Sequence, residues 1–224
     1  MSNSINPFAP PTETGESFLA RSGNFEELAG TETGLRITYY GILLLIFSVF
    51  AIFVTGTFFP QGALFAGVLI ILGWIMLMVG PFFCLNAPPE TGARGAIIAS
   101  IACQLFAILV TLAPYLGLQW GRLASSIGSL MGTIGTVFFI IFLMKIALYI
   151  ERPDLHAKGR SIFILAAILI GATIALTAGA AIMGPAIGVA MIGVVIGMLV
   201  AFVMYANLIN FLFNAIALLR ARNA

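Results

Sequence analysis

Six apolar stretches, each about 20 residues or longer, follow one another along this chain and are separated by short polar or turn-forming segments. A helix of about 20 apolar residues can cross the hydrocarbon core of a bilayer, where only helices and closed barrels satisfy their own backbone groups. The sequence therefore predicts an all-α integral membrane protein, a bundle of six transmembrane helices arranged as three hairpins. The predicted spans are residues 35–57, 63–85, 95–118, 123–150, 160–183 and 186–219.

The composition excludes most soluble classes. Hydrophobic residues make up 61% of the chain and charged residues only 8%, whereas a soluble domain carries roughly 25% charged residues. A water-soluble chain of this length would expose much of its apolar surface, so lipid must surround most of this one. The net charge of +2 and the lack of a basic stripe in the sequence argue against a nucleic-acid partner.

The segments between the stretches carry signals that end or turn a helix. The sequence NAPPETGAR (86–94) follows the second stretch, and two prolines cannot continue a helix. Pro153 ends the fourth stretch because the residue before a proline avoids helical geometry. Gly184 and Pro185 indicate a tight turn between the last two stretches.

The basic residues are distributed unevenly between the two ends of the predicted helices. If the N-terminus is cytoplasmic, nine of the ten Lys and Arg residues lie inside and only Arg122 lies outside. Because cytoplasmic loops carry the excess of Lys and Arg, the sequence predicts a multi-pass protein of the cell inner (plasma) membrane with both termini in the cytoplasm. The inside residues are Arg21, Arg36, Arg94, Lys145, Arg152, Lys158, Arg160, Arg220 and Arg222.

Residues 1–33 form a polar, proline-rich arm before the first span. They lack the pattern of a cleavable signal peptide, so the first span is expected to serve as the insertion signal. The arm is predicted to be disordered and cytoplasmic, with one short helical turn at NFEELAG (24–30). Residues 34–224 then form the transmembrane domain.

The segment ERPDLHAKGR (151–160) holds the only His and the only Asp of the chain. Asp154 is predicted to cap the next helix through its carboxylate, so that this helix begins near Leu155, about a turn before the span enters lipid. His156 and Asp154 resemble an acid–base pair, but the sequence offers no nucleophile, second carboxylate or metal-ligand spacing beside them. We interpret the segment as a solvated loop at the lipid headgroups, and predict no catalytic residue, metal or cofactor.

Gln104 lies about ten residues into the third predicted span, close to the middle of the bilayer. Its amide needs a partner in lipid, and a hydrogen bond to a neighbouring helix is expected, with a solute contact as the alternative. The two cysteines, Cys84 and Cys103, are interpreted as small buried hydrophobes rather than a disulfide.

Small and hydroxyl-bearing residues share the faces of two spans. Such faces let helix backbones approach closely, which favours packing within the bundle or in a homo-oligomer or larger membrane assembly over a polar pore. The fourth span carries Ser125, Ser129, Thr133 and Thr136 beside Gly128, Gly132 and Gly135, and the sixth carries Gly193 and Gly197.

Asn207, Asn210 and Asn214 recur at a spacing that places them on one face of the sixth span. Counting about 20 residues from Ala186 puts Asn207 near the inner membrane interface. An interfacial polar face on an amphipathic extension is the simpler interpretation. A binding vestibule on the cytoplasmic side is the alternative.

Two similar sequences, ETGLR (32–36) and ETGAR (90–94), each precede a span that enters from the inside. Duplication of a hairpin unit would explain them. Convergence is the simpler explanation, because Thr or Glu caps a helix start, Gly loosens a turn and Arg anchors at headgroups.

Several short motifs carry a resemblance to a known set of proteins. These motifs are the NPFAPP leader (6–11), GLRITYYG (34–41), the ERPDL turn (151–155) and the Arg-rich C-terminal end. Together they resemble a set of multi-pass inner-membrane proteins of planctomycete-type bacteria. The resemblance implies location and fold class and carries no activity, substrate or catalytic residue with it.

The sequence leaves two functions open. The first is a non-enzymatic membrane protein with a structural role, or an accessory subunit that packs in an assembly through its Gly-rich faces. The alternative is a small transporter or channel for a neutral or lipidic solute, with Gln104, Ser129, Thr133 and the three asparagines lining its route.

Overall fold

The computed structural model describes residues 28–58, 63–117, 122–183 and 186–223, and within these ranges it contains helices and no strand. Six of the helices are long and apolar enough to cross a membrane, which confirms the predicted fold class. The long helices are α2 (Leu28–Phe58), α3 (Ala63–Phe83), α4 (Arg94–Leu112), α5 (Arg122–Tyr149), α6 (Pro153–Met183) and α7 (Ala186–Asn223). Short 3₁₀ turns are η2 (Cys84–Asn86), η3 (Pro89–Thr91) and η4 (Ala113–Leu116).

The first helix begins well before its apolar stretch. α2 starts at Leu28 rather than at residue 35, so the predicted boundary of the N-terminal arm at residue 33 lies inside a helix. Leu28 and Thr31 are fully buried, and tertiary packing therefore extends the helix beyond its hydrophobic run. The remainder of the predicted arm, residues 1–27, lies outside the described residues.

The turn between α5 and α6 differs from the prediction. α6 begins at Pro153, two residues before the expected start near Leu155, because a proline is well tolerated in the first turn of a helix, where its missing N–H is not needed. Asp154 is therefore inside the helix and is not its N-cap. Its carboxylate instead accepts two hydrogen bonds from Arg152, both at 2.9 Å.

The end of α5 explains why the chain reverses there. Glu151 has a positive φ of 56°, the left-handed conformation that usually terminates helices. Its N–H donates to the Leu148 carbonyl at 3.0 Å, and the Arg152 N–H donates to the Ala147 carbonyl at 2.9 Å. This pair of bonds is a Schellman motif, so backbone geometry and Pro153 together define the turn.

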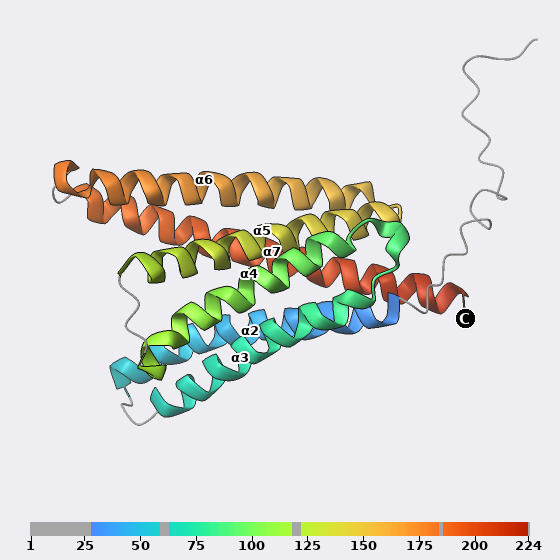
Figure 1. The fold of residues 1–224 in the computed structure, drawn as a ribbon, viewed down its shortest axis with the longest axis horizontal. Coiled ribbons are helices and arrows are strands. Elements are labelled where there is room, and N and C mark those ends of the chain that lie inside the picture. The colour runs from blue at the N-terminus through green and yellow to red at the C-terminus, as the bar shows by residue number, and fades with distance from the viewer. Residues whose placement is uncertain (1–27, 59–62, 118–121, 184–185, 224) are drawn as a thin grey trace, which may run out of the picture.

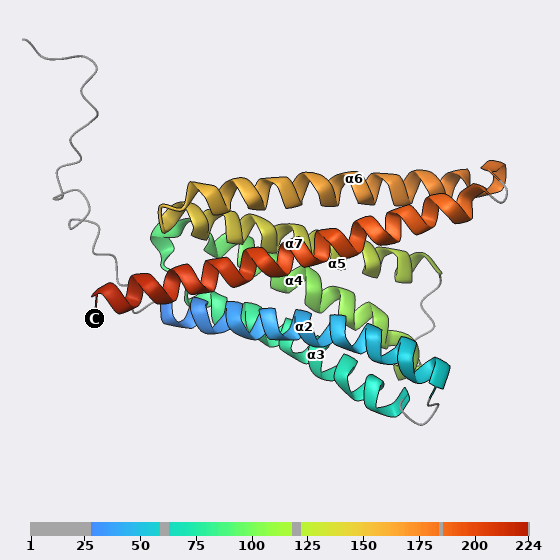
Figure 2. The same ribbon diagram turned by 180° about the vertical axis from the view of Figure 1, so that it is seen from behind.

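The helices form three antiparallel hairpins, α2–α3, α4–α5 and α6–α7, as predicted. The hairpins close into a ring in the order α3, α2, α7, α6, α5, α4, and the seam between α3 and α4 is its most sparsely packed contact. Figure 2 shows α7 running diagonally between α6 and α2. The start of α2 and the end of α7 lie at the same end of the bundle (Figure 1).

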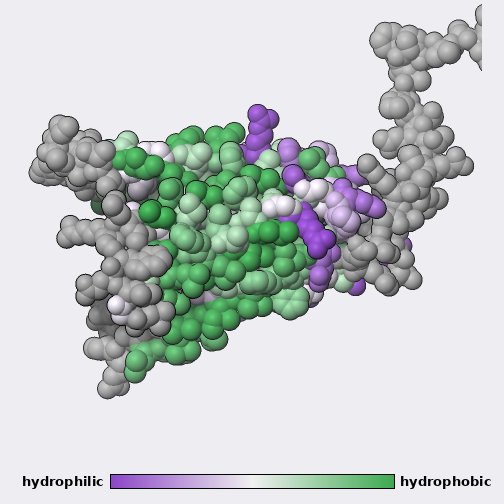
Figure 3. Space-filling model, in the orientation of Figure 1, coloured by the Kyte–Doolittle hydropathy of each residue, from purple (hydrophilic) through white to green (hydrophobic). Residues whose placement is uncertain are grey.

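That end of the bundle also carries the charge. On the face that Figure 3 shows, apolar side chains cover the middle of the molecule and polar side chains gather at the end where α2 starts. We call this the cationic end, and its described basic residues are Arg36, Arg94, Lys145, Arg152, Lys158, Arg160, Arg220 and Arg222. Arg122 begins α5 at the opposite end.

A tight apolar core fills the half of the ring that adjoins the cationic end. It draws on the first halves of α2, α4 and α6 and on the last halves of α5 and α7. Its largest fully buried side chains include Phe139, Phe142, Ile146, Leu208 and Leu212. The described part of the other half has few fully buried side chains, so the ring is packed solidly at one end only.

One carboxylate joins the first and last helices at the cationic end. Glu32, whose side chain is 11% exposed, accepts from Arg36 at 3.0 Å and from Arg220 at 2.7 Å. The Arg220 contact spans 188 residues of sequence. Charge-assisted bonds of this kind are stronger than neutral ones, so the pair closes the ring between α2 and α7.

Glycines allow α2 and α3 to approach more closely than side chains would permit. A Cβ added at Gly34 would lie 2.5 Å from the Gly80 carbonyl oxygen and 2.7 Å from Cys84 Sγ. A second pair lies two turns along, where a Cβ on Gly41 would lie 3.1 Å from the Gly73 carbonyl oxygen. Small residues at helix contacts are the usual means of close packing in membranes.

Replacement of Gly34 tests this contact. Gly34→Ala is expected to lower the stability of the protein by about 1–3 kcal/mol, because the added methyl group overpacks a backbone contact. The measurement is the thermal unfolding midpoint in detergent, followed by circular dichroism. Gly67→Ala is the matched control, since it also changes a helical glycine and a Cβ there meets nothing within 4 Å. Equal midpoints for the two variants would contradict the packing described.

Candidate functional site

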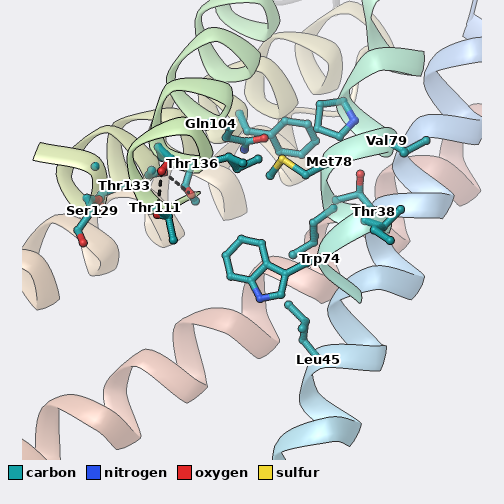
Figure 4. Close-up of a pocket in the computed structure, with 18 of the residues that line it drawn as sticks. Thr38, Leu45, Trp74, Met78, Val79, Gln104, Thr111, Ser129, Thr133 and Thr136 are labelled. Carbon is teal, nitrogen blue, oxygen red and sulfur yellow. Dashed lines mark hydrogen bonds between the residues drawn. The ribbon is translucent and has the colours of Figure 1, made fainter. Parts of the chain in front are cut away.

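A cavity of about 900 Å³ lies inside the ring. It begins near the middle of the bundle, extends toward the end opposite the cationic end, and is walled by α2, α3, α4, α5 and α7. Figure 4 shows Trp74, Gln104 and Thr133 arranged around it. Small-molecule sites typically enclose about 300–1,000 Å³, so the volume suits a ligand of that size.

The solid core forms the base of the cavity. Phe139 is 1% exposed and belongs to the core, and Tyr205 packs against it with ring centroids 6.3 Å apart. Both residues also line the cavity. The cavity is therefore closed toward the cationic end by close-packed aromatic side chains.

A buried hydrogen bond holds α4 and α5 together beside this base. Ser100 Oγ donates to the Gly135 carbonyl oxygen at 2.7 Å, and Ser100 is fully buried. Gln104 donates from Nε2 to Ser100 Oγ at 3.5 Å. The sequence predicted a bond from Gln104 to a neighbouring helix, but within the described structure its hydrogen bond goes to Ser100 of its own helix, which in turn bonds to α5.

The threonines of the cavity wall use their donors within their own helices. Each hydroxyl donates to the carbonyl four residues earlier, at 2.8 to 3.1 Å. A hydroxyl bonded in this way can still accept a hydrogen bond but has no proton left to donate. These residues are Thr38, Thr111, Thr133 and Thr136.

Other polar groups of the wall keep donors for a ligand. The Tyr205 hydroxyl, the Trp74 indole N–H and the Ser129 hydroxyl have no hydrogen-bond partner among the residues that the structure describes. Trp74 is 53% exposed and lies toward the α3 side of the cavity. The cavity thus offers acceptors and a few donors on a largely apolar surface, and none of its described lining residues is charged.

The residues predicted from the sequence divide into two groups. Gln104, Ser129 and Thr133 line the cavity, so the structure brings them together. The three asparagines do not line it and lie on the outside of α7, where Asn214 Nδ2 donates to Asn210 Oδ1 at 3.1 Å. The side chain of Ser125 lies outside the described residues.

Sequence patterns alone did not identify several lining residues. Trp74 and Tyr205 each stand in a run of apolar residues, where an aromatic residue is more often core than site. Pro81 is inside α3, near its end, and also lines the cavity. They could be identified only from which face of each helix points toward the centre of the ring. That face depends on the order of the helices, which the sequence does not reveal.

The glycines of α5 face α4 of the same chain. A Cβ on Gly135 would lie 3.0 Å from Gln104 Cγ, and one on Gly128 would lie 2.9 Å from Val110 Cγ1. These glycines therefore serve the packing of α5 against α4 within one hairpin. On α7, Gly197 packs against Leu169 of α6, whereas a Cβ on Gly193 would meet nothing within 4 Å.

The two ETGxR sequences occupy different structures. Gly34 is within α2 and packs on α3, whereas Gly92 has a left-handed φ of 58° after η3, and its carbonyl oxygen accepts from Lys145 Nζ at 2.6 Å. The same five-residue pattern therefore serves two purposes. This difference favours convergence over duplication.

The remaining polar candidates are isolated. His156 lies in the first turn of α6, and the described residues contain no group of three His, Cys, Asp or Glu side chains that could hold a metal ion. Cys84 is buried, Cys103 is half-buried, and both are free thiols.

Comparison with known proteins adds no relative. No family profile matches the chain, and neither a curated protein nor a solved structure is detectably similar to it. The resemblance to inner-membrane proteins of planctomycete-type bacteria stays a prediction.

Proposed function

We propose that this membrane protein binds a neutral, mainly apolar solute in the cavity and acts as a small transporter or carrier for it. The observation that carries the proposal is the cavity itself, which reaches Gln104 inside a bundle whose other half is solidly packed. A protein that serves only to pack against others has no need of such a space, because filling it would stabilise the fold.

The lining favours a ligand without charge. An ion in an apolar cavity needs a partner of opposite charge, and the described lining residues supply none. The threonine oxygens accept, while Tyr205 and Gln104 can donate. A hydroxyl head group, which donates and accepts at once, matches this set, so a lipid-like alcohol is the favoured class of ligand.

The packing also favours a direction of access. The base of the cavity is closed by Phe139 and Tyr205, and its walls include both sides of the sparsely packed α3–α4 seam. A lipid-like solute would enter sideways from the bilayer through this seam. Passage toward the cationic end would require the core to open.

Tryptophan fluorescence tests the binding step. The chain has two tryptophans, so Trp120→Phe leaves Trp74 as the only one. We expect a brominated long-chain alcohol in phosphatidylcholine nanodiscs to quench Trp74 with saturation at low probe fraction. Thr133→Phe, which fills the cavity, should reduce the saturable part severalfold.

A matched variant and a charged probe complete the test. Ile168→Phe places the same ring on the exposed face of α6 and should leave the quenching unchanged, since Ile168 is 61% exposed. The brominated fatty acid with an ionised carboxylate should bind less tightly. Quenching that stays linear in probe fraction and equal in all variants would refute the proposal.

The proposed orientation rests on the charge distribution. We place the cationic end in the cytoplasm of a bacterial-type inner membrane, because Lys and Arg are retained on that side. A reporter enzyme fused after Gly184 is expected to be active only outside the cytoplasm, and one fused at the C-terminus only inside. The opposite pair of activities would reverse the orientation.

Assembly is the second candidate function, and one observation favours it. Gly193 on α7 and Gly171 on α6 face open space, although small residues usually serve close helix contacts. If this surface binds a second copy or another subunit, cross-linking in mild detergent should yield an oligomer that Gly193→Leu abolishes. A monomer in both cases would exclude assembly through this face. The protein is expected to be non-enzymatic under either function.

A further inference from the structure

The outer face of α7 carries the asparagines that the cavity does not use. Residues 207, 211, 214 and 218 lie within about 60° of one another on a helix with 3.6 residues per turn. Asn207 and Asn214 are exposed there, beside Phe211 at 48% and Leu218 at 63% exposure. A polar row within an apolar, outward-facing surface is unusual for a helix that faces lipid.

Basic residues flank this face on both sides. α7 lies between α2 and α6 (Figure 2). On the α6 side, Lys158 Nζ lies 4.3 Å from the centre of the Phe211 ring. On the α2 side, the Arg36 guanidinium lies 5.5 Å from the centre of the Phe213 ring. Because Phe211 and Phe213 are two residues apart, the two cations lie at nearly the same level along the axis of α7.

The local charge is positive. Glu32 is the acidic partner of Arg36, but Arg220 shares the same carboxylate. Lys158 has no acidic partner among the described residues. Arg36, Arg220 and Lys158 carry three positive charges and Glu32 carries one negative charge. The net charge beside this face is therefore positive and attracts an anion.

The amides have capacity for the same ligand. Asn214 donates one hydrogen bond to the side-chain oxygen of Asn210. Asn207 has no partner in the described part of the chain. Asn207 lies four residues before Phe211, hence about 6 Å nearer the bilayer centre. An unpaired amide at that depth is costly unless a lipid group bonds to it.

We propose that the outer face of α7 binds an anionic phospholipid. Its phosphate lies beside Lys158 and near Asn214, on the Phe211 side of α7, with Arg36 contributing positive charge from the α2 side. An ester carbonyl accepts a hydrogen bond from Asn207. The acyl chains follow the exposed apolar residues of α7, such as Val203 and Val200. This continuation of the surface into lipid favours a lipid headgroup over a free phosphate ion.

Native mass spectrometry of the full-length protein tests the site. Phosphatidylglycerol is titrated into the protein in a neutral detergent, and the apparent Kd of the first bound lipid is measured. Lys158→Gln is expected to weaken this binding about fivefold, the effect of one basic residue at an anionic surface. Asn207→Leu should weaken it in the same direction while leaving the net charge unchanged.

The controls separate this site from general attraction to the cationic end. Arg94→Gln removes an exposed charge at the same end but on α4, and should change the Kd less than twofold. Phosphatidylcholine should bind more weakly than phosphatidylglycerol, and excess inorganic phosphate should not displace the lipid. Equal effects of Lys158→Gln and Arg94→Gln, equal binding of the two lipids, or displacement by phosphate would each overturn the proposal.

Discussion

The absence of water from the bilayer core governs how this chain uses its polar groups. Every polar atom within a span must find a partner in the protein or lose several kcal/mol. The hydroxyls of Thr38, Thr133 and Thr136 meet the requirement locally, by donating to the preceding turn. Ser100 meets it across the α4–α5 contact. Tyr205, Trp74 and Asn207 are different, because their donors have no partner in the described structure. These donors are therefore available to a bound solute or lipid.

The packing is asymmetric along the membrane normal, and this asymmetry creates the cavity. Near the cationic end, large aliphatic and aromatic side chains fill the ring, and Glu32 ties α2 to α7. Farther along, the helices spread, and small residues such as Gly128 and Gly132 replace large ones where α4 and α5 meet. Small side chains draw that pair of helices together but leave the centre of the ring unfilled. One hairpin contact therefore contributes both to the stability of the bundle and to the space within it.

The sequence predicted the number, type and pairing of the helices because long apolar runs separated by prolines and glycines depend on local chemistry. It did not predict the start of α2 at Leu28, which depends on packing against distant residues. It placed the start of α6 within two residues but took Asp154 for the N-cap, whereas Pro153 already stands in the first turn. It selected Gln104, Ser129 and Thr133 because polar residues are conspicuous in an apolar span. It offered the asparagines either as an interfacial polar face or as part of the route, and the structure places them outside the cavity lining, since the face that points inward is determined by the order of helices in the ring. Trp74 and Tyr205 were missed for the same reason.

The link between Glu32 and Arg220 joins residues 188 positions apart, and this separation has a consequence for biosynthesis. While the chain is being translated, α2 enters the membrane long before α7 exists, and Glu32 then has only Arg36 as its partner. The contact between Glu32 and Arg220 can form only after α7 has been synthesised. A chain that stops short of Arg220 would leave Glu32 with Arg36 alone and would lack the ion pair between α2 and α7.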